Sequence, residues 1–193
     1  MPKNALPIIL LIVVVFAALW FVDSPPEQFQ PSPQQEEGKP VLVRYINNVE
    51  TTQFNQLGQR EHFFKATRVN HRRVLNDDSK QPGTAEIFKP NVTLFKNGVI
   101  NWTIQSQFGE SQLGDELIFL REKVLVEQLS PTKGWTITTS SLWIDPNTQE
   151  ANTDAPVKLS TAGLLSTGTG MSASFIDENF KVLANTETIY ETQ

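Results

Sequence analysis

The stretch APVKLSTAGLLSTGTGMSASFIDENFKVL, from Ala155 to Leu183, gives the clearest indication of the fold. Val157 and Leu159 alternate with polar residues, and the same pattern returns over 171–175 and 180–182. Strict alternation places one set of side chains on an apolar face and the other in water, which is typical of half-buried β-strands. Glycine and short polar residues interrupt the pattern, and such residues favour turns. The predicted turns are Ala162-Gly163, Gly168-Thr169-Gly170 and Asp177-Glu178-Asn179, so Gly163 and Gly170 are expected to be structural turn residues.

The same alternation continues through most of the chain after residue 40. Asn97-Gly98 is a strong signal for a tight hairpin turn. A change in the parity of apolar residues within Leu117–Leu129 predicts a β-bulge near Arg121-Glu122-Lys123. Residues 47–76 fit a bulged strand or a short helix, and strand is favoured because no helix caps bound the segment, while 76–83 is predicted to be a loop. At least ten short strands and no helical pattern after residue 25 predict an all-β sandwich, roll or barrel.

The N-terminal residues predict a membrane anchor. Leu6 to Val22 carries no charge and, as a helix, is about 25 Å long, just under the hydrocarbon thickness of a bilayer. Lys3 precedes this run and Asp23 follows it, so the positive-inside rule leaves the N-terminus in the cytoplasm. We therefore expect a cytoplasmic end and transmembrane helix at 1–22, with a cleaved signal peptide as the alternative. Residues 23–40 are rich in proline, glutamine and glutamate, which predicts a flexible linker to a domain at 41–193.

Composition limits the chemistry that this chain can perform. The net charge of −5 argues against nucleic acid as the main partner, because binding to the phosphate backbone needs a basic surface. The chain has no cysteine and two histidines, His62 and His71, whose spacing matches no common metal-ligand motif. The glycines of 163–170 lack the Lys-Ser/Thr of a phosphate-binding loop. We expect no cofactor, no metal site and no enzymatic activity.

The order of several short motifs resembles that of the LptC family, the single-pass inner-membrane component of bacterial lipopolysaccharide transport. The motifs are Ile87-Phe88-Lys89-Pro90 with Trp102, Leu117–Val126, Thr136-Ile137-Thr138-Thr139, and Asn152–Ala173, in which Thr153-x-x-x-Val157 leads to Gly163 and then to Gly170-Met171. The first segment, 41–76, matches the family pattern poorly, since His62 or Phe63 stands in place of a tyrosine.

This resemblance implies a twisted antiparallel β-jelly roll, an open roll of two sheets with an apolar interior, preceded by one transmembrane helix. It also implies that lipopolysaccharide passes through that interior. The lipid would come from the permease subunits of an inner-membrane ABC transporter and leave to a periplasmic bridge protein of the same fold. The bridge protein would pair with the C-terminal edge strand by β-augmentation, and Ile189 and Tyr190 are the residues expected there.

The apolar members of the alternating strands are the expected lipid contacts. They are Phe88, Leu94, Trp102, Ile104, Phe119, Val124, Val126, Ile137, Leu159, Phe180 and Val182. The same residues can instead interlock as a dry core, because core packing is the usual role of such side chains. The alternative function is therefore a membrane-anchored β-sandwich with a closed core that binds a glycan or a protein. Trp135 and Trp143 exposed together on one face would favour that alternative.

Overall fold

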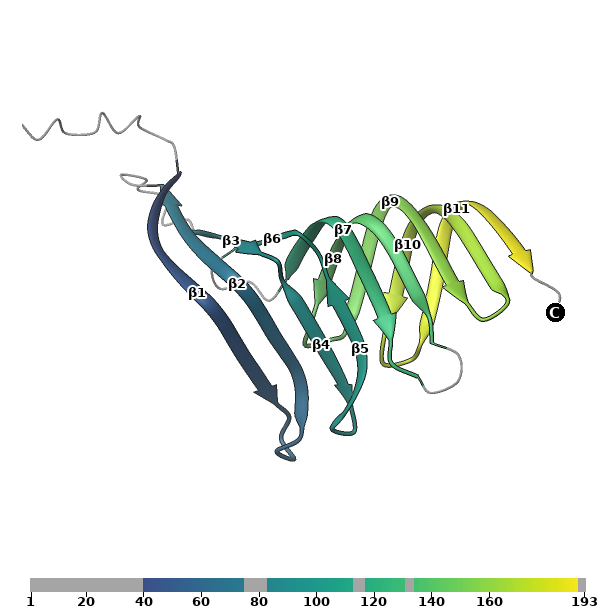
Figure 1. Ribbon diagram of the computed structural model, residues 1–193, viewed down its shortest axis with the longest axis horizontal. Helices are drawn as coiled ribbons and strands as arrows, with labels where there is room; N and C mark the ends of the chain where they lie inside the picture. The colour runs from purple at the N-terminus through teal and green to yellow at the C-terminus, as the bar shows by residue number, and fades with distance from the viewer. Residues whose placement is uncertain (1–39, 75–82, 113–116, 131–133, 191–193) are drawn as a thin grey trace, which may run out of the picture. The chain divides into compact units, whose positions relative to one another are not determined.

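The computed structural model describes residues 40–74, 83–112, 117–130 and 134–190. All of them belong to the second of two units into which the chain divides between Glu36 and Glu37. The eleven strands are β1 (Pro40–Phe54), β2 (Arg60–Val74), β3 (Thr84–Phe88), β4 (Asn91–Lys96), β5 (Val99–Gln105), β6 (Phe108–Gln112), β7 (Ile118–Gln128), β8 (Thr136–Asp145), β9 (Glu150–Thr161), β10 (Leu164–Ser174) and β11 (Asn179–Tyr190) (Figure 1). The predicted anchor at 1–22 and nearly all of the linker lie outside the described residues. Within the described ranges, none of the segments is a helix long and apolar enough to cross a membrane.

The strands form one antiparallel sheet that runs as a simple meander. β2 pairs with β3 over Arg68–Arg72 and with β4 over His62–Lys65. β3 and β4 therefore lie end to end beside β2 and occupy one position in the sheet, which we call a row. β5 and β6 likewise form one row, because both pair with β7. The rows therefore follow the chain order from β1 at one end to β11 at the other, as Figure 1 shows. β1 pairs only with β2, and β11 pairs only with β10, so both are edge strands of the described sheet.

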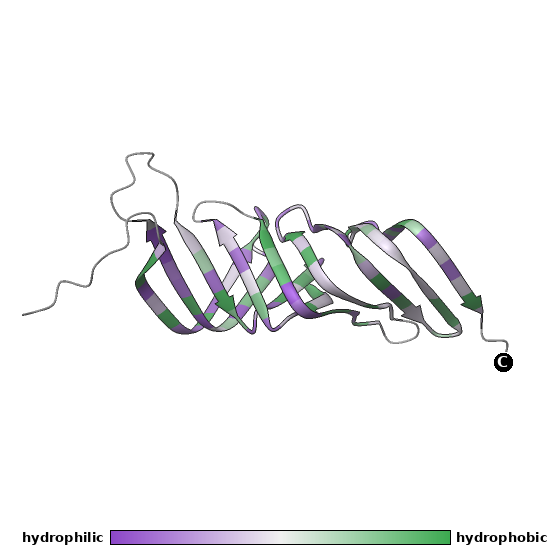
Figure 2. Cartoon of the chain, turned by 90° about the horizontal axis from the view of Figure 1, so that it is seen from above, coloured by the Kyte–Doolittle hydropathy of each residue, from purple (hydrophilic) through white to green (hydrophobic). Residues whose placement is uncertain are grey.

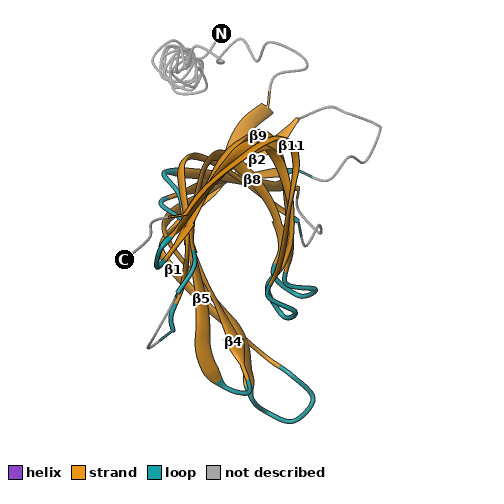
Figure 3. Cartoon of the chain, turned by 90° about the vertical axis from the view of Figure 1, so that its right-hand side faces the viewer, coloured by secondary structure: helices purple, strands orange, loops and turns teal. Residues whose placement is uncertain are grey.

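A line of ladder irregularities crosses the whole sheet, and we call this line the crease. It separates β3 from β4 at Lys89-Pro90 and β5 from β6 at Ser106-Gln107. It continues through register shifts in β7–β8, β8–β9, β9–β10 and β10–β11. Positive φ angles occur along it, at Asn48, Lys89, Glu122, Lys123, Gly170 and Asn185. Bulges of this kind bend strands sharply, and the sheet curls over into a roll (Figure 3).

The core lies between the two halves of the sheet that the crease separates. Leu94, Trp102 and Ile104 come from the half that contains β4 and β5, and Leu120 and Ile144 come from the other half. All five side chains are fully buried. Apolar and polar residues alternate along the strands, as Figure 2 shows by colour, so each strand gives one set of side chains to this core.

The predicted fold class is confirmed. The described chain is all-β and antiparallel, and the two layers expected of a jelly roll are the two halves of one folded sheet. The bulge expected near Arg121-Glu122-Lys123 is present between Arg121 and Val124, and residues 47–74 are strand rather than helix outside the turn at 55–59.

The turn expected at Gly168-Thr169-Gly170 is absent, because β10 continues through these residues. Gly170, with φ of +73°, lies instead in a bulge at the crease, whereas Gly163, with φ of +79°, lies in the two-residue turn between β9 and β10. Glycine is suited to both places because it reaches left-handed φ angles without a steric penalty.

Candidate functional site

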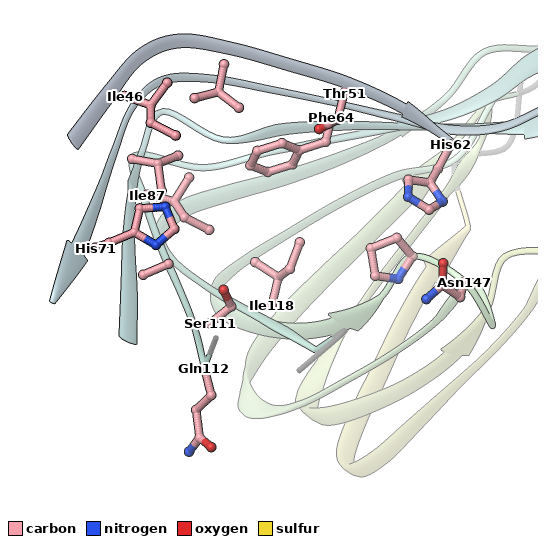
Figure 4. Close-up of a pocket in the computed structure, with 14 residues that line it drawn as sticks. Ile46, Thr51, His62, Phe64, His71, Ile87, Ser111, Gln112, Ile118 and Asn147 are labelled. Atoms are coloured by element: carbon pink, nitrogen blue, oxygen red, sulfur yellow. The ribbon is translucent and has the colours of Figure 1, made fainter. Parts of the chain in front are cut away.

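An apolar pocket of about 420 Å³ lies inside the N-terminal part of the roll, and we call it the N-terminal pocket (Figure 4). Its volume falls in the range of about 300–1,000 Å³ that is usual for small-molecule sites. β1, β2, β3, β6, the start of β7 and the β8–β9 turn contribute its walls. The lining residues are Ile46, Val49, Thr51, His62, Phe64, Val69, His71, Ala85, Ile87, Ser111, Gln112, Ile118, Pro146 and Asn147.

The middle of the N-terminal pocket is apolar. Ile87 and Val69 are buried in a small cluster with Ala66 and Ala85. Phe64 and Ile118 pack against both this cluster and the main core, so they form the inner wall where the pocket meets the core. Figure 4 shows Phe64 and Ile118 between the two histidines, with Ile87 beside His71. An apolar chain in this space would contact carbon on most sides.

An imidazole ring stands at each end of that apolar middle. The Nδ1 atoms of His62 and His71 are buried and have no hydrogen-bond partner in the described chain. Burial lowers the pKa of His62, and the carboxylates of Glu61 and Asp145 partly oppose that effect. Burial also lowers the pKa of His71, with a further lowering from the positive charge of Arg44. Both rings are therefore biased toward the neutral form, which an apolar surrounding favours.

Most of the residues predicted to contact lipid face inward. Seven of them are buried in the main core, namely Leu94, Trp102, Ile104, Val124, Val126, Ile137 and Leu159. Phe180 and Val182 are partly buried and pack against that core. These side chains already contact one another, and none of them lines the N-terminal pocket. Their contact with lipid stays a prediction.

Phe88 and Phe119 differ from the other nine. Ala85 and Ile87 are the inward residues of β3, so the alternation turns Phe88 to the outer face, where its ring lies edge-on to that of Phe108 at 5.7 Å. Ile118 and Leu120 point inward from β7, so Phe119 also lies on the outer face. The expectation of an interior position is thus corrected for these two residues.

The C-terminal edge is exposed where partner contact was predicted. Ile189 is 51% and Tyr190 is 73% exposed, and both belong to the edge strand β11. Their pairing partners in β10 are Leu165 and Leu164. Since one side of β11 is unpaired in the described sheet, its backbone groups are available for β-augmentation.

The tryptophan arrangement that would favour the closed binding module is not found. Trp143 is 44% exposed on the outer face, where its ring lies 4.6 Å from that of Phe119. Trp135 instead packs on the inner side against the main core, with its ring 5.9 Å from that of Phe180. The two indoles therefore lie on different faces.

Sequence reasoning missed the residues of the N-terminal pocket, among them Ile46, Val49, Phe64, Val69 and Ile118. Four of these five lie in β1 and β2, the segment whose pattern was the least regular. The sequence does offer one signal for this pocket, the apolar residues Phe63, Phe64, Ala66 and Val69 of β2. Phe64 and Ala66 point inward on one side of the crease, and Val69 points inward on the other side.

The fold and the pocket define a class of protein, an antiparallel β-roll with an apolar interior. Among the described residues, none of the His, Asp and Glu side chains gather in a group that could hold a metal ion. Residues 9–191 match the family described as lipopolysaccharide-assembly, LptC-related, and the chain belongs to that family. No curated protein matches the chain. Membership makes it a non-catalytic component of lipopolysaccharide transport in the bacterial envelope.

Proposed function

We propose that this protein takes lipopolysaccharide from the permease subunits of an inner-membrane ABC transporter and passes it to a periplasmic bridge protein of the same fold. The observation that carries the proposal is the N-terminal pocket, an apolar space of about 420 Å³ between the two halves of the folded sheet. An acyl chain needs such a space, because transfer of its methylene groups out of water is what stabilises it there.

The two edges of the sheet support the direction of transfer. β1 borders the N-terminal pocket and its outer edge is unpaired in the described sheet, which supports a proposed docking of the lipid donor at that end. β11 forms the opposite edge, and in this proposal the bridge protein docks there. An exposed edge strand is a hazard for aggregation unless a partner covers it, which gives both edges a use in assembly.

The proposed location is the bacterial inner membrane, with a single pass at 1–22, the N-terminus in the cytoplasm and the β-domain in the periplasm. The uncharged run from Leu6 to Val22 supports this arrangement. The linker at 23–40 would hold the domain away from the bilayer.

A photo-crosslinking pair of adjacent residues tests the proposal. A photoreactive amino acid at Ile118 faces the N-terminal pocket, and one at Phe119 lies on the outer face of the same strand. After ultraviolet illumination of the full-length protein with lipopolysaccharide, we expect a covalent adduct at 118 and none at 119. Equal labelling of the two positions, or no adduct at 118 in a folded protein, would show that the pocket does not take the lipid.

A further inference from the structure

A second pocket, of about 570 Å³, lies at the C-terminal end of the roll, and we call it the C-terminal pocket. Its apolar wall is formed by the side chains of Trp135, Leu159, Phe180 and Val182, which also contact the main core. Ser166 and Thr188, which are 3.2 Å apart between their hydroxyl oxygens, add polar groups beside the edge strand β11. Glu178, Asn179 and Lys181 also line this space, so its inner wall is apolar and its rim is polar and charged.

The two pockets share no lining residue. The main core packs against the walls of both pockets, and Trp102 and Phe175 are both fully buried in that core, with ring centroids 5.1 Å apart. Phe180 completes the cluster at 5.3 Å from Trp102 and forms part of the wall of the C-terminal pocket. An acyl chain cannot pass through packing of this density without moving these rings.

Hydrogen bonds from two side chains, Lys96 and Gln149, close the side of the roll opposite the crease. Lys96, at the end of β4, donates from Nζ to the carbonyl oxygen of Ile176 at 3.2 Å and forms an ion pair with Glu178 at 3.2 Å. Gln149, in the β8–β9 turn, donates to the carbonyl oxygen of Phe95 at 3.4 Å. These contacts join one half of the folded sheet to the other, and we call them the clasp.

We propose that the roll holds two separate acyl-chain sites, the N-terminal and C-terminal pockets, and that lipid moves between them only when the clasp opens and the Trp102–Phe175–Phe180 cluster separates. This inference rests on the proposed transport of lipopolysaccharide. The C-terminal pocket takes the same chemical class of ligand, an acyl chain joined to a polar head, because its wall is apolar and its rim is polar. Lys96 and Glu178 are about half exposed, and ion pairs of that kind add little to stability. The ion-pair part of the clasp therefore opens at low cost, whereas the hydrogen bond from Gln149 is buried.

Chemical cross-linking of the clasp tests the inference. The natural chain has no cysteine, so Lys96→Cys with Glu178→Cys gives a pair that a short bismaleimide can join specifically. The full-length double variant would carry a photoreactive residue at Ile118 or at Val182, one in each pocket. Spheroplasts that also contain the transporter supply lipopolysaccharide from the inner membrane alone, so lipid reaches Val182 by passage through the roll.

After cross-linking, we expect the lipid adduct at 118 to remain and the adduct at 182 to fall tenfold or more. The matched control joins Thr138→Cys to Lys158→Cys, two exposed residues that are paired on β8 and β9 away from the clasp, and it should change neither adduct. The opposite change, Lys96→Ala, should raise the initial rate of labelling at 182.

The possible outcomes separate the two proposals. Absence of an adduct at 118 in the uncross-linked protein would overturn the transport function itself. Adducts at both positions that are unaffected by cross-linking and by Lys96→Ala would leave that function standing and overturn the inference of two sites separated by the clasp.

Discussion

Phe119 and Trp143 are paired directly across β7 and β8, with ring centroids 4.6 Å apart, on the outer face of the folded sheet. Their neighbours Ile118 and Ile144 are paired in the same ladder and point the other way, into the roll. One step along β7 thus separates a pocket-lining side chain from a solvent-facing aromatic pair. This relationship provides a matched test of which face carries the lipid.

The first prediction compares Ile118→Arg with Phe119→Arg in the full-length protein. Arginine at 118 places a charge in the apolar middle of the N-terminal pocket, which is costly in the absence of a partner. We expect lipopolysaccharide labelling from a photoreactive residue at Ile87 to fall at least tenfold in Ile118→Arg and to stay unchanged in Phe119→Arg. Circular dichroism verifies that both variants keep their strand content. A loss of labelling in Phe119→Arg alone would place the lipid on the outer face.

The second prediction concerns pH. The chain has two histidines, and both have pKa values below the ordinary 6.5 in the folded state. As pH falls below 6.5, the unfolded state takes up protons first, so the free energy of unfolding falls until the folded-state pKa values are passed. The two neutral imidazole rings therefore make their full contribution to the free energy of unfolding above pH 6.5, and this contribution is lost as the pH falls.

Urea unfolding between pH 8 and pH 5, followed by tryptophan fluorescence, measures this effect. His62→Leu with His71→Leu removes both rings while keeping apolar volume in the pocket, so the slope in this window should shrink. An unchanged slope in the double variant would assign the pH dependence to other groups.

Alternation alone predicts most of the strands but not the faces near the crease. The sequence pattern predicts a bulge near Arg121-Glu122-Lys123 that exchanges the two faces of β7. In the structure Ile118, Leu120, Val124 and Val126 all point inward. Because the bulge contains two consecutive left-handed residues, Glu122 and Lys123, even-numbered residues point inward both before and after it. Phe119 therefore points outward. Local pattern cannot distinguish these two kinds of bulge, because only the ladder with the neighbouring strand fixes the register.

The N-terminal pocket was beyond sequence reasoning for a related cause. Its walls come from β1, β2, β3, β6 and β7 together with the β8–β9 turn, which the crease brings to face one another. No short motif records that juxtaposition. In contrast, Leu94, Trp102 and Ile104 were predicted to point inward because β4 and β5 alternate regularly around the Asn97-Gly98 turn.

The third prediction concerns Gly168, at the crease between β10 and β11. A Cβ atom on this residue would overlap the side chain of Val182 and lie 2.8 Å from the carbonyl oxygen of Ala184. Gly168→Ala must therefore push β11 away from β10, at a cost of about 1–3 kcal/mol in the free energy of unfolding. Ser172→Ala, at an exposed position of the same strand, is the control and should change stability by less than about 0.5 kcal/mol. Equal stability of the two variants would contradict the close approach of β11 to β10.

The last prediction concerns the left-handed backbone of the crease at Glu122, where φ is +63°. The side chain of Glu122 is exposed. The backbone carbonyl oxygen of Glu122 accepts a hydrogen bond from the Gln107 N–H at 2.9 Å, so the backbone rather than the side chain fixes this geometry. Left-handed φ costs an ordinary residue about 1–2 kcal/mol, is most unfavourable for a β-branched residue, and costs glycine little.

Glu122→Gly should therefore leave stability nearly unchanged, while Glu122→Val should lower the free energy of unfolding by about 1–2 kcal/mol relative to the glycine variant. Thr138→Val, at an exposed position of β8 that has no positive φ, controls for the intrinsic effect of valine on a strand surface and should be close to neutral. Urea unfolding of the full-length variants measures all three. If valine were tolerated at 122 as well as at 138, the left-handed φ of Glu122 would not be needed to keep the bulge in β7.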